Sequence, residues 1–476
     1  MSRALSAGVR LALVVLLALA TPASAQSPAR AMSLREAIAF ARAHQPSLEA
    51  ARARVAVARE QASVPRAAWT PRIVAGAELL VGTNNNTTTS YGGALGFDVP
   101  RIGGTPANAA TSYAPDPSTL VGVGVHQEIY DAGRLTAQAD ALDLFARAAE
   151  EDARLADLDL TLYVEDAFYA VVSAHAVVQA AEAAVQRATT HRDFAKARVS
   201  AQLEPPLTLT RAEADLARYD VDRIRALGNL ATAQAVLAAA IGAPDTAIDA
   251  GADDVSYATS PSLAAAIAEL EQRDPALRAA DDNVRAQQQV TRSIHAELLP
   301  EISLSATVTG RAGGADVATE TMPLGNGWLP DVPNWDALVV VSWPLFDRTV
   351  DARARASREI EHVRGAELAD LREQLHGRAA QAVVALQVAA DAMPALERSV
   401  DAARANQAQA DARFTGGLGN AVELADAEAL LTDAEIQLAI GRFQLARARA
   451  RLARVTAEPT PGSADGSSAG PKEPTP

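Results

Sequence analysis

The chain has 476 residues, of which 49% are apolar and only 4% aromatic, and it contains no cysteine. Its 43 basic and 58 acidic side chains give a formal net charge of −15. The missing cysteines exclude disulfide scaffolds, thiolate metal sites, thiol nucleophiles and a lipid anchor on an N-terminal cysteine. The acidic balance argues against a nucleic-acid binder, which carries a basic field. The apolar residues are mostly alanine, which favours closely packed helices over a thick aromatic core.

Residues 1–25 have the pattern of a secretory signal peptide. Arg3 and Arg10 provide the positive end, residues 11–20 form an apolar run, and residues 23–25 (Ala-Ser-Ala) form a cleavage site. The run is too short to span a bilayer, and no later run reaches eighteen uninterrupted apolar residues. Removing the segment takes away two arginines, so the mature charge is 41 − 58 = −17. Such an exported chain crosses a membrane only as a closed barrel of strands.

The chain contains an internal duplication. Residues 33–73 align without a gap onto residues 262–302, and 13 of these 41 positions are identical. Further along, Arg198 matches Arg413 at the smaller offset of 215, so one loop of the first half carries the extra residues. A period near 220 is far too long for a solenoid repeat. We assign a signal peptide (1–25), a first repeat (26–243), a linker (244–261), a second repeat (262–456) and a tail without packed structure (457–476).

Each repeat has two segments in which apolar and polar residues alternate. These predict strands at about 69–82, 118–130, 299–311 and 336–347. Each is close to the length of a tilted membrane strand. Aromatic side chains gather at these segments, as in a membrane-interface girdle; the candidates are Trp69, Tyr130, Trp335, Trp343 and Phe346. A soluble β-sandwich with ordinary core aromatics is the alternative interpretation.

The rest of each repeat predicts long helices. We expect helical hairpins over residues 132–241 and 348–455, and a 67-residue helix is about 100 Å long. Leucine recurs every seven residues at positions 424, 431, 438, 445 and 452. A small residue follows three positions after the first four of these leucines, which predicts coiled-coil seams with close helix contacts. An isolated two-helix coiled coil explains these heptads but not the strands.

Several local motifs resemble those of the TolC-type outer-membrane channel family. They are Ser33–Ile38 with Gln45–Leu48, Leu299–Ile302 before a strand, Tyr130–Arg134 after a strand, and Arg413–Gly419 at a helical turn. The resemblance covers about residues 33–455, and the order and spacing of the motifs carry it. It implies a mainly α fold with membrane β: duplicated coiled-coil helices forming a periplasmic α-barrel, and four strands per chain joining a trimeric 12-stranded β-barrel.

The resemblance also implies a function. It implies a passive exit channel in the outer membrane, with its helical part in the periplasm, serving a tripartite efflux or type I secretion system. The expected partners are two further copies of the chain, a periplasmic adaptor, an inner-membrane transporter and outer-membrane lipid, with no nucleic acid. The alternative from another class is a periplasmic coiled-coil scaffold or adaptor that never enters the membrane.

Two sets of site residues follow from the resemblance. Glu423 and Asp426 occupy positions where the family places carboxylates around its periplasmic constriction, while the first repeat has Thr208 and Arg211 there. Acidic rings favour cations in pores. The hairpin tips implied for adaptor docking comprise Val199, Ser200, Ala201, Leu203, Thr415, Gly416, Gly417 and Leu418. The first tip lacks the glycines of the second, and its two prolines, Pro205 and Pro206, are expected to turn the chain.

No pattern in the sequence indicates an enzyme. The seven histidines are scattered without metal-ligand spacing, and there is no nucleotide-binding motif. We therefore expect no catalytic residues, no metal and no cofactor.

Overall fold

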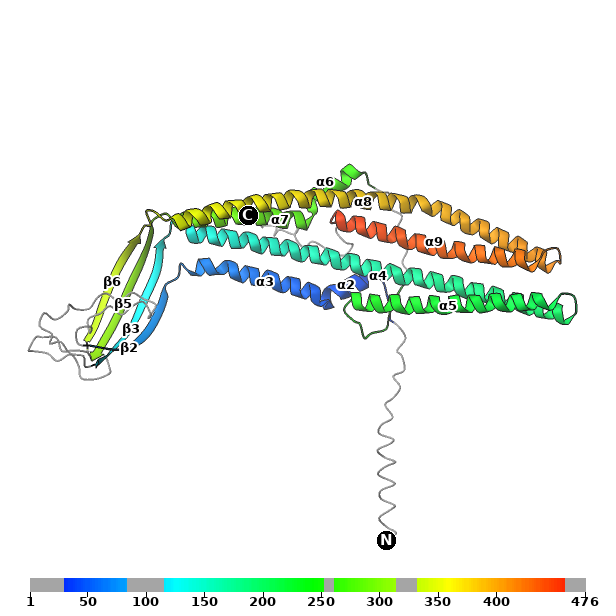
Figure 1. The fold of residues 1–476 in the computed structure, drawn as a ribbon, viewed down its shortest axis with the longest axis horizontal. Coiled ribbons are helices and arrows are strands. Elements are labelled where there is room, and N and C mark those ends of the chain that lie inside the picture. Colours follow the sequence, from blue (N-terminus) through cyan, green and yellow to red (C-terminus); the bar gives the residue numbers. More distant parts are fainter. Residues whose placement is uncertain (1–29, 84–114, 252–260, 314–331, 459–476) are drawn as a thin grey trace, which may run out of the picture. The chain divides into compact units, whose positions relative to one another are not determined.

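The computed structural model describes residues 30–83, 115–251, 261–313 and 332–458 (Figure 1). The predicted signal peptide and nearly all of the tail lie outside these residues. The same order of elements occurs twice. In the first repeat the elements are α2 (Leu34–His44), α3 (Pro46–Ala67), β2 (Arg72–Thr83), β3 (Pro115–Tyr130), α4 (Arg134–Ser200) and α5 (Pro206–Ala240). In the second they are α6 (Leu263–Arg273), α7 (Pro275–Ala296), β5 (Glu301–Gly313), β6 (Val332–Ser342), α8 (Arg348–Thr415) and α9 (Ala421–Val455).

Equivalent helices of the two repeats have almost the same length. Both α2 and α6 have 11 residues, α3 and α7 have 22, and α5 and α9 have 35. The long helices α4 and α8 have 67 and 68 residues. The duplication read from the sequence therefore extends to the secondary structure, and the mainly helical fold with four long strands is confirmed.

Capping and proline placement explain where the short helices begin. Ser33 caps α2 in a capping box, in which the backbone N–H of Ser33 donates to Glu36 Oε2 at 2.9 Å. In the second repeat, the hydroxyl of Ser262 accepts from the backbone N–H of Ala265 at 3.2 Å. Proline also marks the next helix starts, since α3 begins at Pro46 and α7 at Pro275.

The contacts of the chain divide it into two compact units, and each unit draws on both repeats. One unit comprises residues 1–50, 154–275 and 373–476, and we call it the hairpin unit. The other comprises residues 51–153 and 276–372, and we call it the sheet unit. The helices α4 and α8 contribute to both.

The sheet unit contains an antiparallel sheet in the order β2-β3-β5-β6. Register places apolar side chains in rows across one face; Ala75, Val123, Val308 and Trp335, for example, are aligned partners on successive strands. The opposite face is polar, with Thr307 donating to Asp336 at 2.5 Å. One apolar and one polar face is the pattern expected from strict alternation.

The strand ends differ slightly from the prediction. β6 ends at Ser342, so Trp343 and Phe346 lie beyond the strand, and β2 begins after Trp69. Proline explains the early end of β6, because Pro344 has no amide hydrogen to donate to a ladder and restricts the residue before it.

The hairpin unit is held together by seams of small and large apolar residues. Four of the five heptad leucines of α9 are buried, and Leu438 packs at the edge of the same clusters. A second cluster centres on Phe168, Leu237 and Ile241, all fully buried, beneath the two-stranded parallel pair of β1 (Arg30–Met32) and β4 (Ile248–Ala250). The predicted coiled-coil seam is therefore present in α9.

Among the described residues, α4 and α8 each contain an 18-residue window apolar enough, by length and composition, to cross a membrane. The core helices of soluble proteins meet the same criterion.

Gly441 permits close packing between α8 and α9. A Cβ at this position would overlap Leu396 Cδ1 and lie 3.6 Å from Met393 Sδ. We expect Gly441→Leu to overpack this seam, at a cost of about 1–3 kcal/mol, and to lower the melting temperature of the purified protein. Gly377→Leu is the matched control, because nothing lies within 4 Å of a Cβ there. Equal melting temperatures for the two variants would contradict this packing.

Candidate functional site

The first hairpin tip turns at a left-handed residue. Gln202 has φ 59°, and the backbone N–H of Leu203 donates to the carbonyl of Arg198 at 2.9 Å. This closes the end of α4 in the manner of a Schellman motif. Pro205 and Pro206 were expected to turn the chain, but they instead begin α5: Pro205 is its N-cap and Pro206 its first residue. Proline suits this position because the first helical amides have no partner within the helix.

The second tip has the same backbone geometry. Gly417 has φ 74°, and the N–H of Leu418 donates to the carbonyl of Arg413 at 2.8 Å. The side chain of Asn420 then caps α9, accepting from the N–H of Glu423 at 2.8 Å. Arg413, Gly417 and Leu418 each lie 215 residues after their counterparts in the first tip, which are Arg198, Gln202 and Leu203. The missing glycine of the first tip therefore does not change the turn.

The predicted tip residues lie together at their respective turns, and most are exposed. The side chains of Leu203 and Leu418 stand out because they are large, apolar and 69% and 80% exposed. Val199 is half-buried, and the others are exposed. The turns thus present one exposed leucine each from equivalent positions.

Glu423 and Asp426 lie in the first turns of α9 with exposed side chains. Their spacing of three residues places them on one side of the helix. Glu423 forms an ion pair with Arg413, whose Nε lies 3.1 Å from its Oε1. Within the described part of the chain, no such pair is recorded for Asp426. The two acids are therefore not equivalent, because only Glu423 has its charge compensated by a neighbour.

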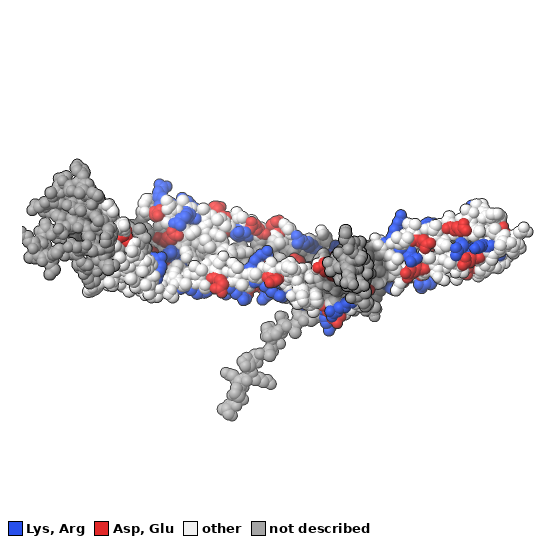
Figure 2. Space-filling model, turned by 90° about the horizontal axis from the view of Figure 1, so that it is seen from below, with Lys and Arg blue, Asp and Glu red and all other residues white. Residues whose placement is uncertain are grey.

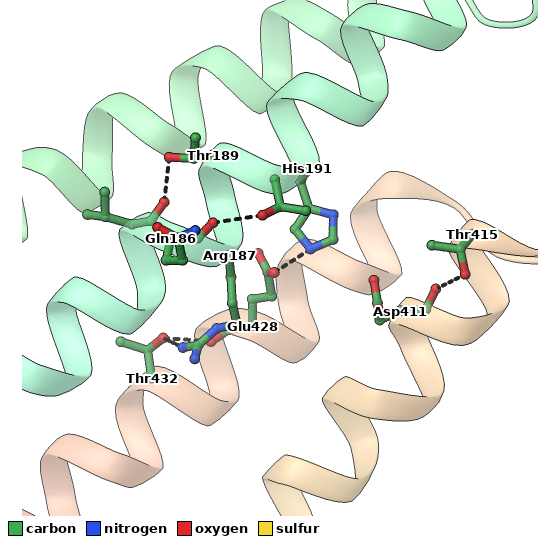
Figure 3. A network of polar contacts seen from close by, with 10 residues as sticks. Gln186, Arg187, Thr189, His191, Asp411, Thr415, Glu428 and Thr432 are labelled. Atoms are coloured by element: carbon green, nitrogen blue, oxygen red, sulfur yellow. Dashed lines mark hydrogen bonds and ion pairs between the residues drawn. The ribbon is translucent and has the colours of Figure 1, made fainter.

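A network of contacts joins the two hairpins near the tips, and the sequence analysis missed it. His191 on α4 contacts Glu428 on α9, with 2.6 Å between Nε2 and Oε1 (Figure 3). One turn away, Arg187 Nη2 donates to Thr432 Oγ1 at 3.1 Å. The contacts connect residues more than 230 positions apart, so no local spacing could have indicated them.

A cavity of about 370 Å³ adjoins this network. Its lining comes from α4, α5, the end of α8 and the start of α9. The polar groups that face it are His191, Arg211, Asp215 and Glu428, and Phe414 provides an apolar wall. Thr208 and Arg211, the counterparts of the predicted constriction acids, lie in this lining.

The predicted interface aromatics all belong to the sheet unit. Tyr130, Trp335, Trp343 and Phe346 have 50%, 79%, 57% and 78% of their surface exposed. Trp343 donates its indole N–H to the carbonyl of Leu298 at 3.2 Å. Trp69 is half-buried. Exposed rings with a polar tip fit a boundary between an apolar and an aqueous phase.

Charged side chains of both signs are mixed along the helices on the face shown in Figure 2. Within the described ranges, no group of three or more acidic or histidine side chains has the arrangement of a metal site. Many carboxylates pair with arginine or histidine, as Asp157 does with Arg42 at 2.7 Å.

One half-buried carboxyl of the hairpin unit has an altered acidity. Burial raises the pKa of Glu165 on α4 to about 7, and the neighbouring charge of Asp166 adds to the effect. Arg449 opposes this rise without cancelling it. Deprotonation of Glu165 therefore destabilises the fold, progressively between about pH 4.5 and 7.

The chain is similar to known proteins at the level of family and fold. The sequence model of the outer membrane efflux protein family matches residues 37–243 and 266–458. Among curated protein sequences, no significant relative is found.

Solved structures share the fold at low identity. VceC, an outer membrane protein of Vibrio cholerae, is 18% identical, with a TM-score of 0.71 over 89% of this chain and 95% of that one. CusC, whose structures concern folding and transmembrane channel formation, is 18% identical, with a TM-score of 0.73 over 91% of this chain and 95% of that one. The open-state outer membrane channel MtrE of Neisseria gonorrhoeae is 18% identical, with a TM-score of 0.68 over 89% and 88%.

The tips generate one prediction. A residue other than glycine in the left-handed region is strained by about 1–2 kcal/mol. Replacing it with glycine removes this strain, but part of the gain is offset because glycine loses more conformational entropy on folding. We expect Gln202→Gly to stabilise the protein by about 0.5–1 kcal/mol and Gly417→Gln to destabilise it by a similar amount. Melting temperatures check this, and the double variant should return to the wild-type value. Shifts of the same sign in both single variants would refute the shared turn geometry.

Glu165 generates a second prediction. Its pKa is raised above the unfolded value, so its destabilising effect is absent at pH 4, grows between about pH 4.5 and 7, and is complete above pH 7. We expect Glu165→Gln to stabilise the protein at pH 8 by up to about 3 kcal/mol, with the gain disappearing near pH 4.5. Thermal unfolding at several pH values measures this. The exposed Glu182→Gln on the same helix is the control, and an equal response in both would contradict the assignment.

Proposed function

The chain belongs to the outer membrane efflux protein family, and from this premise we propose that it is the passive exit duct of a tripartite efflux or type I secretion system. Family membership makes it an outer-membrane transport channel and not an enzyme. The finer proposal is that its helical part extends through the periplasm and docks by the hairpin tips onto an adaptor and an inner-membrane pump. The pump supplies the energy.

The single observation that carries the proposal is the sheet with one apolar face and two free edges. On the apolar face, Ile73, Leu79, Val308 and Val339 are between 57% and 70% exposed. Burying this face against lipid is favourable. Among the described strands, nothing pairs with the outer edges of β2 and β6, and an open edge in lipid leaves backbone groups without hydrogen bonds.

Association of three copies removes both edges. Three chains provide 4 × 3 = 12 strands, enough for one closed barrel whose polar face lines the interior. The two repeats of each chain then give the helical part an approximate six-fold character. The mature trimer carries 3 × −17 = −51 formal charges, which favours cationic over anionic solutes along the duct.

The tips support the docking part of the proposal. Leu203 and Leu418 occupy equivalent positions and are the most exposed large apolar side chains of the two turns. An apolar group held on a rigid turn is suited to a shallow pocket of a partner. Three copies would present six such leucines, one from each hairpin.

A periplasmic scaffold that never inserts into the membrane is the rival function, and fractionation separates the two. We expect the mature protein to remain with outer membranes after a carbonate wash and to need detergent for release. We also expect it to migrate as a trimer on unheated gels. A monomer released without detergent would refute the channel.

The constriction generates a prediction about individual acids. Arg413 compensates the charge of Glu423, so Asp426 should contribute more to the binding of blocking cations. We expect Asp426→Ala to raise the concentration of Mg²⁺ or Co²⁺ needed for half-block roughly tenfold, equivalent to about 1.4 kcal/mol. Glu423→Ala should have a smaller effect, and Arg413→Ala should strengthen the block.

Single-channel recordings in planar bilayers measure this block. The control is Glu397→Ala, which removes an exposed acid of α8 away from the tip. If cation block is unchanged in both Asp426→Ala and Glu423→Ala, the constriction does not lie at these positions. A larger effect of Glu423→Ala than of Asp426→Ala would contradict the compensation by Arg413.

A further inference from the structure

The contact between His191 and Glu428 is the most enclosed ion pair recorded between the two hairpins in the described residues. Their side chains are 17% and 7% exposed, and 2.6 Å separates Nε2 from Oε1. His191 comes from α4 of the first hairpin and Glu428 from α9 of the second (Figure 3). The pair lies near the tips, because Glu428 follows the predicted constriction residue Asp426 by two positions. It therefore joins the segments that must separate if the tips are to open.

Aromatic rings pack beside this pair. The ring of Phe414 at the end of α8 lies edge-on to His191, with 6.1 Å between ring centroids. Phe194, one turn beyond His191 on α4, contacts the same ring at 5.4 Å. In such surroundings an ion pair is stronger than on an open surface, and an unpaired charge costs more.

The other ionisable groups near the pair are Arg187 on α4 and Arg211, Asp215, Arg218 and Tyr219 on α5. Burial raises the pKa of Tyr219, so its hydroxyl stays neutral. Arginine remains cationic, and histidine is the side chain whose charge ordinarily changes between pH 5 and 8. Protonation of the imidazole is therefore the principal electrostatic change at this contact in that range.

Protonation changes the strength of the contact in one direction. A neutral imidazole leaves the buried carboxylate charge of Glu428 without a cation from this partner. A protonated imidazole makes the same contact an ion pair between opposite charges. The contact is strongest when His191 is protonated, and it weakens as the pH rises and the proton is lost.

We propose that His191 and Glu428 form a proton-controlled latch that holds the two hairpins together at mildly acidic pH and releases them as the pH rises. The consequence for conduction rests on the proposed channel function. The adjoining cavity of about 370 Å³ is lined by both side chains and gives water access to the pair. It also leaves space into which α9 can move when the contact is lost.

Two other histidine–carboxylate pairs of the hairpin unit serve as matched controls. His376 contacts Glu271 at 2.8 Å, and His175 contacts Asp249 at 2.7 Å. In both pairs the histidine side chain is more exposed than that of His191, at 29% for His376 and 37% for His175. They connect α8 to α6 and α4 to β4, and neither connects one hairpin to the other.

Conductance as a function of pH tests the latch. Wild type, His191→Gln, Glu428→Gln and His376→Gln are recorded in planar bilayers between pH 5.5 and 8.0. We expect the mean conductance of wild type and His376→Gln to rise several-fold with pH. The two latch variants should be open at acidic pH and show at most a small pH response. A flat wild-type profile, or an unchanged response in His191→Gln, would overturn the latch and leave the channel function standing.

A second measurement does not depend on conduction. A double-mutant cycle on melting temperature, with His191→Gln, Glu428→Gln and both together, gives the coupling between the two side chains. We expect the coupling to be clearly larger at pH 6 than at pH 8. All four proteins retain Glu165, so its titration contributes equally and cancels. Equal coupling at both pH values would overturn the latch, whereas a protein that conducts at no pH would refute the proposed function.

Discussion

The hydrogen-bonding groups along the outer edges of β2 and β6 set the constraint on which the proposed assembly depends. The sheet has an exposed apolar face suited to lipid, yet its two edge strands have no partner among the described residues. A bilayer core offers no water to these groups, so a single chain is incomplete as a membrane structure. Closing the edges with further copies satisfies the backbone and creates a lumen in the same step.

The long helices α4 and α8 contribute to both compact units. Alanine and glycine along the seams allow helices to approach closely, as Gly441 does against Leu396. The low aromatic content noted in the sequence belongs to these helices, whereas exposed rings such as Trp335 and Phe346 belong to the sheet unit.

Patterns that repeat within a short window could be predicted from the sequence. The capping box at Ser33, the helix break before Pro46 and the leucine heptads of α9 depend on nearby residues, and each is present. The left-handed turn at Gln202 was not predictable from propensity, because the following prolines offered a simpler account of the turn. The bounds of the repeats and the roles of the tip and constriction residues remain predictions.

The contact between His191 and Glu428 could not be predicted for a different reason. It depends on which helices of the two repeats become neighbours, and neither residue stands in a pattern that marks a partner. Buried polar pairs of this kind are set by tertiary packing, and a wrong neighbour would leave a buried charge uncompensated. The sequence could identify the family and the elements, but the link between the hairpins required the structure.

Cross-linking between the two edge strands tests the closed assembly most directly. The chain has no native cysteine, so Ala75→Cys on β2 can be combined with Ala337→Cys, Val339→Cys or Val341→Cys on β6. Within one chain, three strand spacings separate β2 from β6 by about 14 Å, which is too far for a disulfide. The account predicts that oxidation in the membrane links chains to each other up to a trimer for at least one pair. Only uncross-linked monomers for all three pairs, or products larger than a trimer, would contradict it.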